Sequence, residues 1–173
     1  PATEPHSDRY VFTTGRATVP PPLICPPRYE LKLGQKHHRN SVPTIASVSD
    51  PHEIANVLGA DGVRWMLRNA AQSPFNVVFG APSCVPATPF ETAGATLDAA
   101  AVAALLDLPG VGYLSEVMNY PGVLAGDADL LAKIAAARQR GLPVDGHAPG
   151  LTGDEAAHYA AAGISTDHEC MSL

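Results

Sequence analysis

Val111-Gly-Tyr-Leu-Ser-Glu-Val-Met-Asn119 is an apolar run that gives way to polar residues, and Leu142-Pro-Val-Asp-Gly-His147 repeats this pattern further along the chain. Between them, residues 127–140 are rich in alanine and leucine, start at an aspartate suited to an N-cap and stop before a glycine. These features predict a strand, a helix and a second strand. A connection of this length joins parallel strands through a right-handed crossover, so the stretch predicts a βαβ unit.

The same alternation extends in both directions from this unit. The further apolar, β-prone runs occupy residues 44–48, 76–80 and 163–165, and the further helical stretches occupy residues 51–58, 62–71, 98–107 and 152–162. About five strand–helix units in a row predict an α/β fold with a parallel sheet. This arrangement corresponds to part of a TIM-like (β/α)8 barrel, which needs ~250 residues when complete.

Local signals predict several helix starts and one buried side chain. Asp50, Asp98 and Asp127 are expected N-caps, because short polar side chains accept the free amide hydrogens of a first helical turn. Thr152-Gly-Asp-Glu155 has the pattern of a capping box. Trp65 lies in an apolar helical stretch and is expected in the core.

Composition narrows the classes of partner. The 173 residues carry a formal charge of −6, with 46% hydrophobic and 16% charged residues, which is typical of a soluble globular domain. An acidic chain without a basic stripe does not fit nucleic acid as its main partner, and no apolar run approaches the ~20 residues of a membrane span. Three widely spaced cysteines, and a polar first segment without the features of a secretory signal, predict a reducing, cytoplasmic location.

Residues 1–44 differ from the rest of the chain. They contain eight of the seventeen prolines and a basic cluster that includes His37 and His38. Because proline removes amide donors and fixes φ, we expect an irregular segment with at most a short edge strand near residues 10–12. Adjacent histidines point in different directions on a strand or a helix, so a solvated loop is favoured over a metal pair. A boundary near residue 45 therefore separates this segment from a barrel domain over residues 45–173.

Three residues with metal-ligating side chains, Glu116, His147 and His168, each follow an expected strand. The carboxyl ends of parallel strands meet at one rim of a barrel, where such groups can hold divalent ions and activate water. Each residue also has a simpler interpretation, as a loop residue bonded to backbone groups or to solvent. Asp167 and Glu169, the neighbours of His168, can orient its imidazole or act on a substrate.

Two further segments are candidates for contact with a substrate. His52 and Glu53 lie near the start of an expected helix on the same rim, although Asp-Pro-His-Glu is also an ordinary helix start. Ser83 and Cys84 lie in a proline-rich loop after the strand at residues 76–80. No Gly-x-Ser-x-Gly motif surrounds Ser83, so a nucleophilic serine is disfavoured. A small buried apolar residue is the simpler role for Cys84.

Together these segments resemble the adenine deaminases of the amidohydrolase superfamily. Five motifs carry the resemblance, in family order across residues 48–171: Asp50-Pro-His-Glu-Ile-Ala-Asn-Val57, Pro82-Ser-Cys-Val-Pro-Ala-Thr88, the segment around Ser115-Glu-Val-Met-Asn119, residues 145–150, and Asp167-His-Glu-Cys170. The resemblance implies a metal-bearing, distorted α/β barrel of the amidohydrolase type. It also implies the hydrolytic deamination of adenine to hypoxanthine and ammonia.

The resemblance assigns roles to individual residues. Glu116 would bridge two divalent ions, manganese or iron with zinc also possible, and His147 and His168 would hold one of them. The residues that would line the substrate side are His52, Glu53, Ser83, Cys84 and Glu169. A metal-activated hydroxide would attack C6 of adenine, and protonation of the departing amine would complete the reaction.

Two family features are missing from the given sequence. No His-x-His pair occurs in residues 1–49, and the aspartate of the eighth barrel strand would lie beyond Leu173. With about half of the expected ligands, the isolated chain is expected to deaminate adenine poorly or not at all. The alternatives are a non-catalytic or truncated remnant, and a hydrolase of another cyclic amide or amidine. Unpaired edge strands would favour a homo-oligomer.

Overall fold

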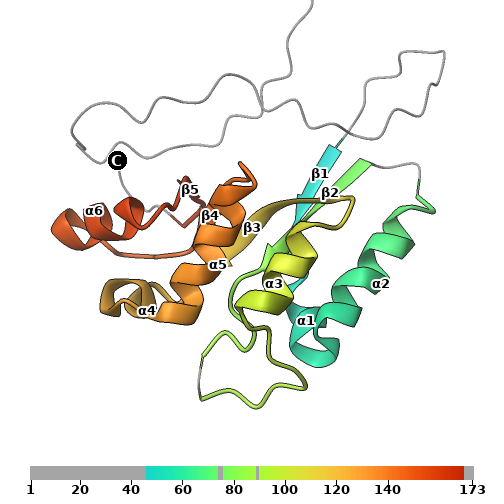
Figure 1. Ribbon diagram of the computed structural model, residues 1–173, viewed down its shortest axis with the longest axis horizontal. Coiled ribbons are helices and arrows are strands. Elements are labelled where there is room, and N and C mark those ends of the chain that lie inside the picture. The colour runs from blue at the N-terminus through green and yellow to red at the C-terminus, as the bar shows by residue number, and fades with distance from the viewer. Residues whose placement is uncertain (1–45, 74–75, 89, 170–173) are drawn as a thin grey trace, which may run out of the picture.

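A computed structural model describes residues 46–73, 76–88 and 90–169, which form one parallel sheet with helices packed alongside it (Figure 1). The strands are β1 (Ala46–Ser49), β2 (Asn76–Pro82), β3 (Val111–Val117), β4 (Val144–Gly146) and β5 (Thr166–Asp167). The helices are α1 (His52–Leu58), α2 (Ala60–Ala70), α3 (Ala99–Leu106), α4 (Tyr120–Ala125), α5 (Ala128–Gln139) and α6 (Gly153–Ala161).

The sheet follows the order of the chain. Each strand pairs in parallel with the next, in the order β1-β2-β3-β4-β5, and helices lie in every connection between consecutive strands. Consecutive parallel strands joined through helices are the repeating unit of a (β/α)8 barrel. The predicted α/β fold with barrel-type topology is therefore confirmed. Among the described residues, β1 and β5 are the two edges of the sheet.

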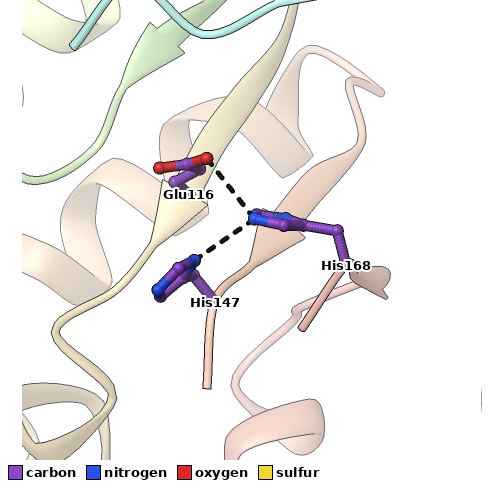
Figure 2. Close-up of side chains that lie close together, drawn as sticks. All are labelled: Glu116, His147 and His168. Carbon is purple, nitrogen blue, oxygen red and sulfur yellow. Dashed lines mark hydrogen bonds and ion pairs between the residues drawn. The ribbon is translucent and has the colours of Figure 1, made fainter. Parts of the chain in front are cut away.

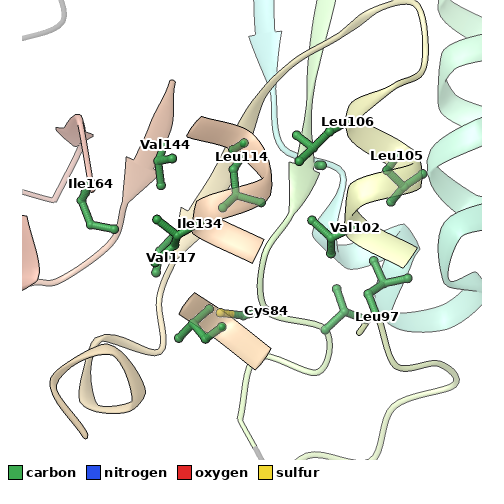
Figure 3. Close-up of a cluster of buried hydrophobic side chains, with 14 of the residues drawn as sticks. Cys84, Leu97, Val102, Leu105, Leu106, Leu114, Val117, Ile134, Val144 and Ile164 are labelled. Atoms are coloured by element: carbon green, nitrogen blue, oxygen red, sulfur yellow. The ribbon is translucent and has the colours of Figure 1, made fainter. Parts of the chain in front are cut away.

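The core lies between the middle of the sheet and the helices that cover it (Figure 3). Leu114 of β3, Leu105 of α3 and Ile134 of α5 are almost completely buried, and α3 and α5 contact β2, β3 and β4. Each such side chain contributes roughly 1.5–3 kcal/mol when it is removed from water. This packing fixes the positions of the central strands, whose carboxyl ends carry the candidate site.

Two of the predicted helix caps are confirmed and two are wrong. The carboxylates of Asp98 and Asp127 accept hydrogen bonds from the amides of the third residue of α3 and α5. The Thr152 side chain makes no capping hydrogen bond to α6. Asp50 does not cap α1, which begins after Pro51; its carboxylate bonds Ser115 and His52 instead.

Three other features differ from the sequence-based expectation. The last strand begins at Thr166, three residues after the expected start, and a short helix, α4, occupies residues for which no helix was predicted. Asn119 caps α4 by accepting a hydrogen bond from the Gly122 amide. Trp65 is 51% exposed on α2, so the prediction that it belongs to the core is wrong. The expected features of residues 1–44 lie outside the described residues.

None of the helices among the described residues combines the length and the apolar character that a membrane span requires.

Candidate metal centre

Glu116, His147 and His168 lie together at the carboxyl edge of the sheet, on the ends of β3, β4 and β5 (Figure 2). The Nε2 atom of His168 lies 3.4 Å from Oε1 of Glu116 and 3.2 Å from Nδ1 of His147. Each of the three side chains offers one potential ligand atom, and these atoms lie within 4.8 Å of one another. The three side chains on which the sequence analysis concentrated are therefore neighbours in space.

The spacing of these atoms suits a divalent ion. Ligand atoms at the distances usual for zinc nitrogen and oxygen bonds lie about 3.4 Å apart in a tetrahedral site. Two imidazoles and one carboxylate are also donors that zinc, manganese and iron accept. The exposed fraction of the Glu116 side chain is 22% and that of His168 is 39%, so the site is open enough for a ligand to enter. The residues present fit the divalent metal ion that the resemblance implies.

Asp145 determines which nitrogen of His168 faces the site. Its Oδ2 atom lies 2.9 Å from Nδ1 of His168, and its Oδ1 atom accepts a hydrogen bond from the Thr166 hydroxyl. A proton on Nδ1 leaves Nε2 with its lone pair directed at Glu116 and His147, as in carboxylate–histidine–metal arrangements. Burial disfavours the charged imidazole, but the carboxylates of Asp145, Glu116 and Glu169 outweigh it and raise the pKa of His168.

The expectation that Asp167 or Glu169 orients the imidazole needs a correction. The two oxygens of Asp167 accept hydrogen bonds from the amides of Ala148 and Glu169. This carboxylate therefore holds the backbone after β4 and β5 and does not bond the His168 imidazole. The Glu169 carboxylate lies 4.0 Å from Nε2 of His168, on the opposite side of the ring from Asp145. The orienting role belongs to Asp145, because only its oxygen reaches Nδ1.

An irregularity in β3 places Glu116. The pairing of β3 with β4 shifts register between Leu114 and Val117, and Glu116 has a φ of +40°. In a regular strand consecutive side chains point to opposite faces. Here Ser115 bonds Asp50 in the loop after β1, while Glu116 lies 3.5 Å from His52 at the start of α1, so both side chains reach the same neighbouring segment. Such an irregularity re-aims a side chain at the end of a strand.

A second group surrounds the other oxygen of Glu116. Oε2 of Glu116 lies 3.5 Å from Nδ1 of His52, and that nitrogen lies 3.0 Å from Oδ2 of Asp50. Asp50, His52 and Glu116 form a second set of potential metal ligands. Burial raises the pKa of Asp50 to about 6, against the opposing effect of the hydrogen bond from Ser115. Sequence reasoning missed Asp50 and Ser115, because the local helix-start pattern explained the aspartate.

The remaining substrate-side candidates differ in exposure. Glu53 is exposed, with Oε1 3.6 Å from Nε2 of His52, and Glu169 is partly exposed beside His168. Ser83 and Cys84 are buried, at 1% and 7% exposure. The Ser83 hydroxyl donates to the Glu116 carbonyl at 2.7 Å. Substrate contact by these residues stays a prediction.

Comparison with known protein families agrees with the fold. The sequence profile of the amidohydrolase family matches residues 44–173. The chain belongs to the amidohydrolase family, whose members depend on metal ions.

The relatives narrow the resemblance further. The adenine deaminase of Salinibacter ruber is 63% identical over 130 residues, which is 75% of this chain and 24% of that relative. The adenine deaminase of Methanothermobacter thermautotrophicus is 59% identical over 129 residues, again 75% of this chain and 24% of the relative. The similarity to adenine deaminases is thereby confirmed. The chain spans about a quarter of the length of the curated relatives it matches.

Proposed function

We propose that Glu116, His147 and His168 bind a divalent metal ion and that this centre serves the hydrolytic deamination of adenine to hypoxanthine and ammonia. The observation that carries the proposal is the approach of a Glu116 oxygen and a His147 nitrogen to within 3.4 Å of the His168 Nε2 atom, at the ends of three adjacent strands. The substrate class is inferred from relatives named adenine deaminase. A metal-assisted hydrolysis is the chemistry that such a donor set supports.

In this proposal, the residues of this chain hold the metal ion and orient the side chains that bind it. Asp145 keeps the Nδ1 proton of His168, so that Nε2 remains a donor to the ion. Glu116 presents one oxygen to His168 and the other to His52. When bound, a divalent ion lowers the pKa of water and makes it a nucleophile near neutral pH.

The substrate side is proposed to lie around His52, Glu53 and Glu169. Asp50 ties Nδ1 of His52, which leaves the Nε2 edge of the ring to bond a purine nitrogen. The two glutamates can accept hydrogen bonds from adenine N–H groups, because both are accessible at the rim. Ser83 and Cys84 would shape the pocket from behind, since both side chains are buried.

Glu116 is also the proposed bridge of a binuclear centre. Its two oxygens face different groups, one with His147 and His168 and the other with Asp50 and His52. A carboxylate in this position can bridge two ions, whereas a neutral imidazole cannot. Manganese or iron, with zinc as a further possibility, suits the mixture of imidazole and carboxylate donors.

The remaining parts of the proposal concern the chain as a whole. Residues 45–173 would form the barrel portion and residues 1–44 a separate irregular segment. The protein would act in the cytoplasm on a small-molecule purine, with neither nucleic acid nor membrane as partner. The edge strands β1 and β5 offer unpaired backbone groups on the described part of the sheet, which supports self-association.

Calorimetric titration of the metal-free 173-residue chain with Mn²⁺ tests the centre. His147→Ala and His168→Ala should each weaken binding by more than the ~10–100-fold typical of a lost outer partner. His158→Ala is the matched control, because His158 is an exposed histidine on α6 outside both ligand groups. An absence of Mn²⁺ binding, or equal binding by all four proteins, would refute the proposed centre.

Adenine specificity needs a separate measurement. Equilibrium dialysis of the Mn²⁺-loaded chain should show binding of adenine and no binding of cytosine at the same concentration. Ammonia release should stay well below ~1 per second, the low end for enzymes, because part of the family ligand set is missing. Ammonia release from adenine at ~1–1000 per second would show that these residues suffice for catalysis. Equal binding of both bases would contradict the substrate assignment.

A further inference from the structure

Two buried hydroxyl groups bond consecutive carbonyls at the end of β3. The Ser83 hydroxyl donates to the carbonyl of Glu116 at 2.7 Å, and the Tyr159 hydroxyl donates to the carbonyl of Val117 at 2.6 Å. Ser83 is 1% exposed and Tyr159 is 4% exposed. They come from opposite sides, Ser83 from the segment after β2 and Tyr159 from α6. The backbone on which Glu116 depends is therefore held by side chains from both neighbouring units.

The Tyr159 hydroxyl also connects two ligand-bearing strands. It accepts a hydrogen bond of 3.2 Å from the amide of His147 while it donates to Val117. Burial raises the pKa of Tyr159, so the hydroxyl keeps its proton and remains a donor. One oxygen atom thus links the backbone beside Glu116 to the backbone of His147.

The conformation of Glu116 explains why such support matters. Its φ of +40° lies in the left-handed region, which a residue with a Cβ atom occupies at an energetic cost. The Met118 amide donates to the Glu116 carbonyl at 2.6 Å, so the chain turns tightly here. A strained residue persists only where its surroundings hold it, and such residues cluster at functional sites.

We infer that Ser83 and Tyr159 are positioning residues that fix the strained end of β3, so that the Glu116 carboxylate stays aligned with His147 and His168. The inference rests on the proposed function of Glu116 as a metal ligand. It gives Ser83 a role through Glu116 in place of direct contact with substrate. The sequence analysis assigned no role to Tyr159.

A purely structural role makes a different prediction. Loss of either hydroxyl removes a hydrogen bond to a carbonyl at the end of β3, which lowers thermal stability whether or not Glu116 binds a metal. Only a positioning role also weakens metal binding in protein that is still folded. The discriminating quantity is therefore the Mn²⁺ dissociation constant at a temperature well below unfolding, measured beside the melting temperature of the metal-free protein.

The test uses Ser83→Ala and Tyr159→Phe in the 173-residue chain, with Mn²⁺ alone as the probe. Each variant should bind Mn²⁺ about tenfold more weakly, as is usual for lost outer partners. Ser83→Thr keeps a hydroxyl and should bind Mn²⁺ like the native chain. Ser165→Ala is the matched control, since its hydroxyl bonds the Val144 carbonyl at the far end of β4. It should lower the melting temperature without changing the dissociation constant.

The outcomes separate the inference from the proposed function. If the native chain does not bind Mn²⁺, the proposed metal centre fails. If the native chain binds and both variants bind equally well while melting lower, the metal centre stands and the positioning role is wrong. Should Ser83→Ala fail to fold, Tyr159→Phe decides alone, because it keeps the buried ring and removes only the hydroxyl.

Discussion

Replacement of Asp145 by asparagine tests whether a carboxylate is needed to orient His168. Oδ2 of Asp145 lies 2.9 Å from Nδ1 of His168, and Oδ1 accepts a 2.7 Å hydrogen bond from the Thr166 hydroxyl. Asparagine has the same size but only one accepting oxygen, so it cannot serve both partners. If the amide nitrogen turns toward the ring, the Nδ1 proton moves to Nε2 and the lone pair no longer faces Glu116 and His147.

The size of the effect follows from the geometry and the exposure of the pair. Loss of an outer-shell partner weakens metal binding by ~10–100-fold, equivalent to about 1.4–2.7 kcal/mol. The His168 side chain is 39% exposed, and solvent screens the interaction, so the expected loss is near the lower end, about tenfold. Calorimetric titration with Mn²⁺ measures it directly.

Asp154→Asn is the matched control for this experiment. Asp154 is exposed in the first turn of α6 and belongs to neither ligand group. The same chemical change there should leave the Mn²⁺ dissociation constant unaltered. Native-like binding by Asp145→Asn, in a protein whose His168→Ala variant has lost binding, would show that packing alone orients the imidazole.

Three further predictions concern stability. Gly80→Ala should destabilise the fold by about 1–3 kcal/mol in urea unfolding, because a Cβ atom would lie 2.4 Å from the Ser115 side chain; an unchanged midpoint would contradict this. Leu114→Ala should cost about 2–5 kcal/mol in the same assay, since Leu114 is completely buried; a loss below that range would mean that the core closes over the cavity. Arg140 bonds both oxygens of Asp107 and lowers its pKa, so this stabilisation is present above the unfolded pKa of ~3.9 and is lost as the pH falls through the lower folded value. Asp107→Asn should therefore lower the melting temperature at pH 7, and the difference from the native chain should shrink in acid; a difference that persists at pH 2 would be inconsistent with the ion pair.

The sequence predicts the order of the elements well, because that order depends on local patterns. Apolar runs alternate with alanine-rich stretches, as expected of successive βαβ units. Asp98 and Asp127 cap their helices by accepting hydrogen bonds from amides three residues further along the chain. The meeting of Glu116, His147 and His168 follows from the same regularity, since each lies at the carboxyl end of a parallel strand. Their role as metal ligands stays a prediction.

The errors have a common cause, which is competition from distant partners. Asp50 has the local context of an N-cap, yet the Ser115 hydroxyl, 65 residues away in sequence, bonds its carboxylate instead. The register shift in β3 depends on how β3 pairs with β4, and the sequence of β3 alone does not predict it.

The positions of the proposed ligands within the sheet indicate that binding of one ion and catalytic turnover depend on different residues. Glu116, His147 and His168 lie at the ends of the adjacent strands β3, β4 and β5. Of their supporting groups, Asp145 and Tyr159 lie in the same units, and Ser83 lies in the preceding unit, after β2. The ion proposed between Glu116, His147 and His168 would therefore need no ligand outside these three residues. The other oxygen of Glu116 faces Asp50 and His52, and the His-x-His pair that the resemblance to adenine deaminases implies does not occur in residues 1–49. The first ion should consequently bind to the chain as it stands, whereas catalysis depends on how the second position is completed.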